Sequence, residues 1–237
     1  MSAAAVAARL DDLASRFGLS PVARAQLGIL LELLEDEQAP TTVHEPGRAV
    51  EAHIADALTG LEVEQVRTAR TIADLGAGAG IPGLVLAAAL PEAHVSLVES
   101  VGKKAAYIDR VAAAMGLDNA EVVASRAESW REGIGRCDVV TARAVAALPI
   151  LVEYAAPLLS AGGALVAWKS QPDPAEHEDG EHAARILGMS PARPTPIAPQ
   201  PGADRRSLYV YVKLRETPGI YPRRPGIARK RPLRAPS

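Results

Sequence analysis

The fold of this 237-residue chain is decided by the stretch Thr71-Ile72-Ala73-Asp74-Leu75-Gly76-Ala77-Gly78-Ala79-Gly80-Ile81-Pro82-Gly83. An apolar run of strand length passes through four glycines within eight residues and leads directly into a helical stretch. Glycine permits tight turns and close approach of a ligand to the backbone, and a helix start offers unpaired N–H groups. A glycine turn that serves only helix packing explains so many glycines poorly. We therefore predict a strand, a cofactor-binding loop and a helix.

The identity of the cofactor depends on the acid that precedes the glycines. Gly78-x-Gly80-x-x-Gly83 also fits the dinucleotide fingerprint, so the loop alone is compatible with a nicotinamide or flavin enzyme. A carboxylate at the loop entrance would repel a pyrophosphate, whereas Asp74 suits the cationic amino group and sulfonium of S-adenosylmethionine. The next apolar strand ends in Glu99, 21 positions after Gly78, where a carboxylate can accept both ribose hydroxyls. These positions favour a methyltransferase.

Apolar runs of strand length alternate with helical stretches from Arg70 onward. This alternation predicts an α/β fold with a mostly parallel sheet and helices on both faces. We expect strands at 71–75, 94–99, 120–124, 137–142, 163–168 and 208–212. We expect helices at 82–90, 102–115, 149–160 and 183–189.

Helical periodicity also precedes this region. One helix is expected to end at Gly18, a second to begin after the N-cap Ser20 with Pro21 at its first position, and a third to span 50–61. We divide the chain into a helical lead-in (1–65), a main domain (66–214) and a basic tail (215–237). The tail carries seven basic residues and one acid on a chain whose formal net charge is −2.

The composition indicates the size of the core and the cellular compartment. Hydrophobic residues make up 48% of the chain, enough for one sizeable core. The single cysteine, Cys137, excludes an intramolecular disulfide and fits a reducing cytoplasm. We read no signal peptide, no membrane span and no cluster of His or Cys with metal-ligand spacing. We expect a cytoplasmic monomer that uses no metal and contacts no membrane.

Further candidate site residues follow the later strands. Ala127 and Glu128 could bracket an adenine edge, although Glu128 fits a helix-dipole role equally well. Arg143 and Lys169 lie at expected carboxyl ends of strands, where open α/β sheets bind ligands, and we take both as catalytic candidates that position phosphate or base. The alternative for Arg143 is a surface salt bridge. The basic clusters could neutralise RNA phosphates, though charge runs are usually only solvated; their residues are Lys103, Lys104, Arg223, Arg224, Arg229, Lys230 and Arg231.

Taken together, these segments resemble the RsmG (GidB) methyltransferases over most of the chain, from about Thr41 to the tail. The resemblance is carried by Asp74–Gly83, Glu99–Lys104, Ser125–Glu128, Ala142–Ala144, His53–Leu58 and Tyr221–Gly226. It implies a Rossmann-like class I S-adenosylmethionine-dependent fold with a seven-stranded sheet, and methylation of N7 of a guanine in 16S ribosomal RNA or the small ribosomal subunit. It also implies cofactor contacts from Gly76, Ile81, Ala127, Glu128 and Arg143, to which the loop pattern adds Asp74, Ala77, Gly78 and Glu99.

The chain departs from the family pattern in the helical lead-in. Ala39-Pro40-Thr41 stands where the family carries Asn-Leu-Thr, Ala52 replaces a basic residue and Ala57 replaces a serine. These differences concern RNA docking more than cofactor binding. Two alternatives stay open: a small-molecule methyltransferase or NAD enzyme, and an RNA-binding ribosome assembly factor with a vestigial cofactor pocket. Guanine N7 carries a lone pair, so the expected reaction requires alignment and charge stabilisation rather than a general base.

Overall fold

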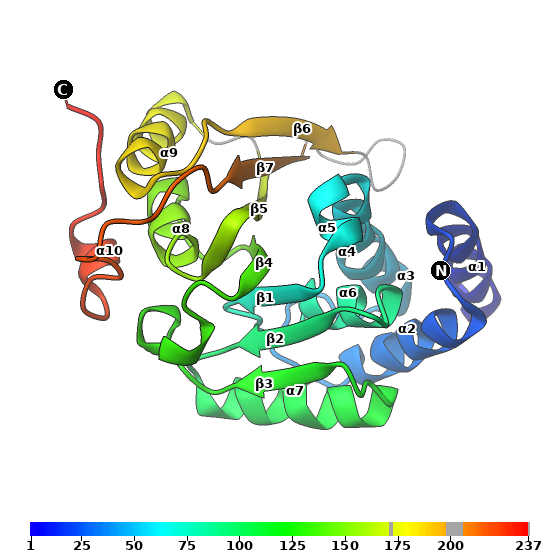
Figure 1. The fold of residues 1–237 in the computed structure, drawn as a ribbon. Coiled ribbons are helices and arrows are strands. Elements are labelled where there is room, and N and C mark those ends of the chain that lie inside the picture. The colour runs from blue at the N-terminus through cyan, green and yellow to red at the C-terminus, as the bar shows by residue number, and fades with distance from the viewer. Residues whose placement is uncertain (171–172, 198–205, 237) are drawn as a thin grey trace.

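The computed structural model describes residues 1–170, 173–197 and 206–236, and a seven-stranded sheet lies at its centre (Figure 1). The strand order is β3-β2-β1-β4-β5-β7-β6. Strands β1 to β5 pair in parallel, and β7 is antiparallel to both β5 and β6. The strands are β1 Thr71–Leu75, β2 His94–Val98, β3 Ala120–Val123, β4 Cys137–Arg143, β5 Leu159–Ser170, β6 Arg193–Ile197 and β7 Arg206–Val212. The predicted α/β class and mostly parallel seven-stranded sheet are confirmed.

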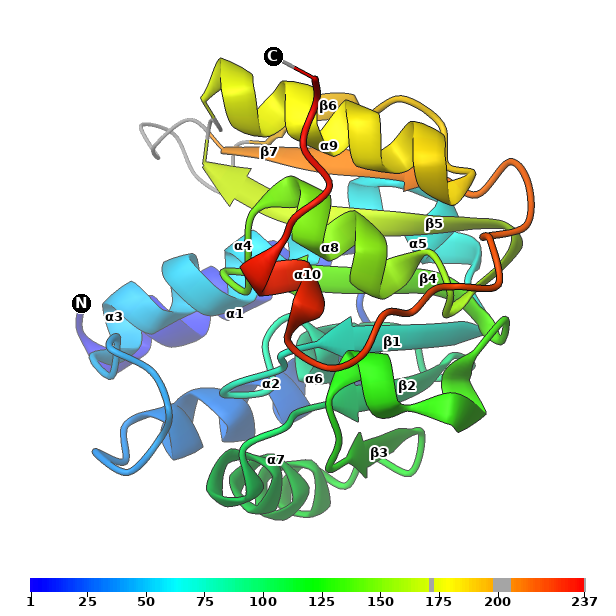
Figure 2. The same cartoon turned by 90° about the vertical axis from the view of Figure 1, so that its left-hand side faces the viewer.

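Helices cover both faces of the sheet (Figures 1 and 2). Neighbouring strand residues alternate between two apolar clusters: Ile72 and Val139 join one cluster, whereas Ala73 and Val140 join the other. Both faces are therefore buried, which explains why the central strands read as continuous apolar runs. Helices α6 (Gly83–Ala89) and α7 (Gly102–Met115) pack on the first face, and α8 (Leu148–Ala155) and α9 (Pro174–Leu187) pack on the second.

The N-terminal helices share the first apolar cluster with the sheet. Helix α1 (Ala3–Phe17) ends at Gly18 in the left-handed conformation, and α2 (Pro21–Leu34) begins where the Ser20 hydroxyl accepts a hydrogen bond from the Ala23 backbone N–H at 3.1 Å. Both follow the sequence prediction. The expected third helix is instead a series of short turns: α3 (Pro46–Ala49), a π-helix η1 (Val50–Ala55), α4 (Asp56–Leu58), a 3₁₀-helix η2 (Thr59–Glu62) and α5 (Glu64–Thr68).

The structure also differs from the sequence prediction in the second half of the chain. The expected helix 149–160 ends at Ala155. The expected strand 163–168 begins earlier, at Leu159, because β5 contains an irregularity around Gly162: Cys137 pairs with Leu159, whereas Val139 pairs with Ala164. Strand β6 was not placed from its residues because Pro194 and Pro196 are atypical of strands; β6 pairs only with β7, and an edge strand tolerates them. Helix α9 begins at Pro174 rather than at 183, since Asp173 caps it.

Candidate active site

The glycine-rich loop lies where β1 pairs with β2 on one side and with β4 on the other. Ligands of open α/β sheets bind outside the carboxyl ends of strands at such a switch point. Gly76 follows β1 with φ of +64°, and a Cβ atom there would lie 2.9 Å from Cγ2 of Val145. At Gly83 a Cβ would lie 2.9 Å from the Cβ of Asp74. The loop therefore needs glycine both for its backbone conformation and for close packing.

Asp74 is buried beneath this loop. Its Oδ2 accepts a hydrogen bond from the Gly83 backbone N–H at 2.9 Å, and its Oδ1 accepts one from the Thr141 hydroxyl at 2.9 Å. Burial raises the pKa of Asp74 to about 7, although both hydrogen bonds oppose this shift. Asp74 is 1% exposed and is not among the residues that line the neighbouring cavity, so the direct contact with a cofactor amino group that was expected from the sequence stays a prediction. In this arrangement Asp74 joins β1 to the start of α6 and fixes the loop between them.

Glu99 follows β2 and is held from two sides. Its Oε2 accepts a hydrogen bond from the Gly78 backbone N–H at 3.1 Å, and its Oε1 accepts one from the Val101 backbone N–H at 2.8 Å. The residue is only 5% exposed, yet it lines a cavity of about 430 Å³. A carboxylate has about four lone-pair sites, so two remain for a diol.

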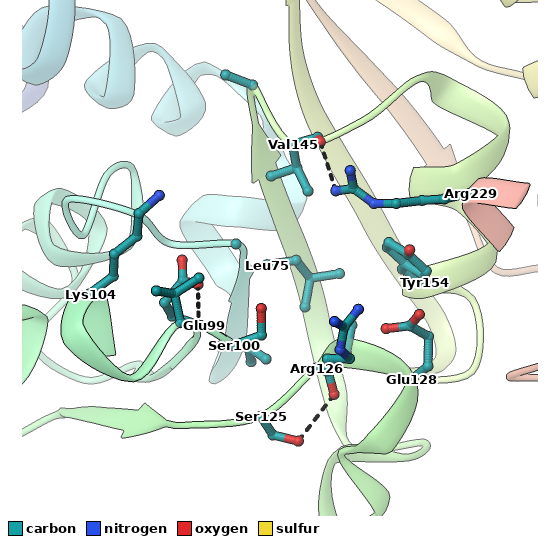
Figure 3. A pocket seen from close by; sticks show the side chains of 15 residues that line it. Leu75, Glu99, Ser100, Lys104, Ser125, Arg126, Glu128, Val145, Tyr154 and Arg229 are labelled. Atoms are coloured by element: carbon teal, nitrogen blue, oxygen red, sulfur yellow. Dashed lines mark hydrogen bonds between the residues drawn. The ribbon is translucent and has the colours of Figure 1, made fainter. Parts of the chain in front are cut away.

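This cavity is formed at the carboxyl ends of β1, β2 and β4, by the loop and short helix after β3, and by residues of α7, α8 and the tail. Its volume is in the range of small-molecule and cofactor sites. Figure 3 shows Glu99 on one side and Glu128, Tyr154 and Arg229 on the other. The lining residues are Leu75, Gly76, Val98, Glu99, Ser100, Val101, Lys104, Ser125, Arg126, Ala127, Glu128, Ala144, Val145, Tyr154 and Arg229.

Several of the predicted cofactor residues line this cavity, and others do not. Gly76, Glu99, Ala127 and Glu128 line the cavity. The predicted contacts Ala77, Gly78 and Ile81 lie in the adjoining loop and are not among the lining residues. Gly78 acts through its backbone N–H on Glu99.

On the side of the cavity opposite Glu99, the sequence predicted Glu128 but not Tyr154, and it assigned Arg229 to RNA. Glu128 lies in a short 3₁₀-helix, η3 (Ala127–Ser129), and its Oε1 accepts a hydrogen bond from the Gly226 backbone N–H at 3.0 Å. Burial and the charge of Glu128 raise the pKa of the Tyr154 hydroxyl, and its hydrogen bond with Arg229 opposes this. Arg229 donates to the Val145 carbonyl oxygen at 3.2 Å. Tyr154 carries no motif signal.

Arg143 ends β4 but turns away from the cavity. Its Nη1 donates to the Ala52 carbonyl oxygen at 2.7 Å and to Asp56 Oδ2 at 3.0 Å, and its Nη2 lies 3.2 Å from His53 Nδ1. Burial and the Arg143 charge lower the pKa of His53 to about 4, so its ring is neutral at pH 7. Ala144 then turns the chain with φ of +58°, a conformation that no other non-glycine residue adopts in the described part of the chain.

Asp56 lies between two arginines. Its side chain is 2% exposed, and its Oδ2 also accepts a hydrogen bond from Arg206 Nη1 at 3.0 Å. Its Oδ1 is buried and accepts no hydrogen bond from any residue that the structure describes. Arg206 was not singled out from the sequence, although it begins the strand that pairs antiparallel with β5 and so starts at the edge where β5 ends.

Lys169 is paired within the protein. Its Nζ lies 2.6 Å from Glu176 Oε1, and it donates a hydrogen bond of 3.4 Å to the Ala146 carbonyl oxygen. It is not among the cavity-lining residues. The contacts of Arg143 and Lys169 with substrate therefore stay predictions.

The basic residues expected to bind RNA fall into three groups. Lys103, Arg224, Lys230 and Arg231 are exposed. Lys104 and Arg229 line the cavity, and Arg229 is exposed as well. Arg223 is bound to both carboxylate oxygens of Glu153 on α8 and to the Arg231 carbonyl oxygen.

The described residues contain neither a group of three His, Cys, Asp or Glu side chains placed to hold a metal ion nor a helix long and apolar enough to cross a bilayer. The cavity itself offers carboxylates, a phenol, guanidinium groups and backbone N–H groups, which suit a polar nucleoside.

Solved structures share this fold at low sequence identity. An S-adenosylmethionine-dependent O-methyltransferase from Thermotoga maritima aligns with 79% of this chain and 72% of its own at a TM-score of 0.55 and 13% identity. An S-adenosylmethionine-dependent methyltransferase from Aquifex aeolicus aligns with 78% of this chain and 97% of its own at a TM-score of 0.54 and 14% identity. These likenesses show a Rossmann-like methyltransferase fold.

Sequence comparison is more specific. A ribosomal RNA small subunit methyltransferase G from Rubrobacter xylanophilus is 44% identical over 80% of this chain and 75% of its own length. A protein of the same name from Deinococcus deserti is 39% identical over 88% of both chains. The GidB family model, described as rRNA small subunit methyltransferase G, matches residues 27–197. The chain therefore belongs to the rRNA small subunit methyltransferase G (GidB) family, as the segments quoted from its sequence predicted.

Proposed function

We propose that the chain transfers a methyl group from S-adenosylmethionine to N7 of a guanine in 16S ribosomal RNA, as a monomer in the cytoplasm. The observation that carries the proposal is the cavity at the carboxyl ends of β1, β2 and β4, with Glu99 held by Gly78 and Val101 on one side and Glu128 on the other. Family membership supports the RNA substrate.

The residues present fit the cofactor. The open lone pairs of Glu99 suit the ribose hydroxyls, and Ala127 and Glu128 suit the polar edge of adenine. Gly76, Ala77, Gly78 and Ile81 would shape the methionine side of the site, and Asp74 would hold the loop in place. S-adenosylmethionine, when bound, supplies a methyl group activated by a sulfonium.

Methylation of guanine N7 requires no general base. Guanine N7 carries a lone pair in the plane of the base, so no proton has to be removed before methylation. The protein then has to align the base and exclude water, for which Arg143 and Lys169 are candidates at the same sheet edge. The exposed Lys103, Arg224, Lys230 and Arg231 are candidates for phosphate contacts.

The test uses a bacterial strain that lacks its own 16S rRNA guanine-N7 methyltransferase. Expression of the chain should restore 7-methylguanine in 16S rRNA, as mapped by mass spectrometry of nuclease fragments. Gly76→Asp should abolish it because the new side chain meets Val145, whereas Gly219→Asp, at a glycine with open space around it, should not. Restored methylation by Gly76→Asp would contradict the assignment of this loop to the cofactor site. Absence of methylation with the wild-type chain would overturn the rRNA methyltransferase proposal and would favour a small-molecule substrate or an RNA-binding assembly role.

A further inference from the structure

The basic tail is docked on the body of the protein and closes one end of the cavity. Arg223 binds the buried Glu153 of α8, and the Ala235 backbone N–H donates to Asp179 Oδ1 at 2.8 Å. Between these anchors, the four-residue helix α10 (Ile227–Lys230) lies beside α8, and its Ala228 is buried in the apolar cluster of that face (Figure 2). The tail is thus a structural part of the cavity wall.

Docking brings two tail residues to the Glu128 side of the cavity. The Gly226 backbone N–H binds Glu128, and Arg229 extends its guanidinium over Tyr154 to the Val145 carbonyl oxygen (Figure 3). One bond to Val145 occupies one of the five N–H donors of the guanidinium. A second interaction is with the Tyr154 hydroxyl, and the other donors lie on the side of the cavity that also carries the acceptor Glu128 and a second arginine, Arg126.

We propose that Arg229 binds the cofactor at its adenine end. The inference rests on the proposed function. It places in the cofactor site a residue that was predicted to bind RNA because it belongs to the basic tail. Adenine presents an acceptor nitrogen beside its exocyclic amino donor. Arg229 supplies the donor and Glu128 the acceptor that this edge requires, on the side of the cavity opposite the ribose-binding Glu99.

The neighbouring Lys230 provides a matched control. It is exposed, lies on the same short helix and does not line the cavity. Arg229→Ala, Arg229→Lys and Lys230→Ala are compared with the wild-type chain by calorimetric titration with S-adenosylhomocysteine and with adenosine. Fluorescence anisotropy with a 16S rRNA transcript, measured over a range of salt concentrations, reports RNA binding separately.

Arg229→Ala should weaken S-adenosylhomocysteine binding about tenfold or more, because hydrogen bonds of charged groups are lost. Arg229→Lys should weaken it similarly, because lysine lacks the planar fork. The affinity of both Arg229 variants for adenosine should fall by the same factor, since the contact is with the base. The affinity of Lys230→Ala for S-adenosylhomocysteine should stay within about twofold of the wild-type value, and any effect of Lys230→Ala as a candidate phosphate contact should be confined to RNA binding. Arg229→Ala should keep the wild-type salt dependence of RNA binding.

Wild-type affinity of Arg229→Ala for S-adenosylhomocysteine would overturn the inference, and so would an equal loss in Lys230→Ala. A loss confined to S-adenosylhomocysteine, with adenosine unaffected, would place Arg229 at the amino-acid end and also contradict the assignment. Failure of the wild-type chain to bind S-adenosylhomocysteine is a different outcome, because it would overturn the proposed function itself.

Discussion

The carboxylate of Glu99 accepts a hydrogen bond from the backbone N–H of Gly78 at 3.1 Å, across the gap between the end of β2 and the glycine-rich loop that follows β1. This contact links the two sequence signals that were read separately, the glycines and the acid at the next strand end. It fixes the distance between the loop and the carboxylate before any ligand arrives. A preorganised carboxylate loses less conformational entropy on binding than a mobile one.

Glu99→Gln should weaken S-adenosylhomocysteine binding by about ten- to a hundredfold, because two charge-assisted hydrogen bonds to a diol become neutral ones. Calorimetric titration measures the change. Glu92→Gln serves as the control, since Glu92 is exposed in the turn before β2. Equal affinities of Glu99→Gln and the wild-type chain would show that Glu99 does not contact the ribose.

Gly76→Ala should cost more stability than Gly116→Ala. Both glycines have positive φ, +64° and +66°, but only at Gly76 does a new Cβ meet another side chain, Val145. The strained backbone should lower the free energy of unfolding by about 1 kcal/mol at either site. The steric overlap should lower it by about 1–3 kcal/mol more at Gly76. Urea unfolding measures both losses, and Val145→Ala should recover part of the second in a double-mutant cycle. Equal losses at the two sites would contradict the packing argument.

Much of the sheet and half of the cavity could be predicted from sequence because both depend on local pattern. The strand at 71–75 matches β1 residue for residue, and parallel strands bring their carboxyl ends to one edge, so Glu99 and Glu128 were expected to face the same site. The edge strand β6 could not be placed because its prolines contradict local strand propensity. Its tertiary position on the edge makes them acceptable.

The other half of the cavity depends on contacts between residues far apart in the chain. Arg229 looked like part of a charged tail because no local pattern indicates that Arg223 finds a buried partner, Glu153, 70 residues away. The direction of the Arg143 side chain could not be predicted from the sequence either. It depends on the lead-in segment packing against the sheet, which presents Ala52 and Asp56 to the guanidinium.

Asp56→Ala should destabilise the protein by about 3–5 kcal/mol, because it leaves Arg143 without its buried carboxylate partner and removes the link to Arg206. Urea unfolding gives the free energy of unfolding. Glu62→Ala, which removes one exposed ion pair with Arg16, should cost about 1 kcal/mol or less. A loss at Asp56 no larger than that at Glu62 would mean that the two arginines find other partners at little cost.

Asp74→Asn should change how stability depends on pH. Folding raises the pKa of Asp74 from about 3.9 in the unfolded chain to about 7, through burial above all. The contribution of Asp74 to stability is therefore greatest below pH 4 and is lost as the pH rises through 7, by up to about 4 kcal/mol. Asparagine does not ionise, and its amide can still accept a hydrogen bond from the Gly83 N–H and donate one to the Thr141 hydroxyl.

The difference in free energy of unfolding, Asp74→Asn minus wild type, should accordingly rise between about pH 5 and pH 7 and level off near pH 8. The difference is the informative quantity because His53, whose pKa folding lowers to about 4, acts in the opposite direction: stability is lost as the pH falls from about 6.5 to 4. That contribution is common to both proteins and cancels. Urea unfolding at each pH supplies the values, and a difference that stays constant from pH 5 to 8 would show that Asp74 is not held in a site that disfavours its charge.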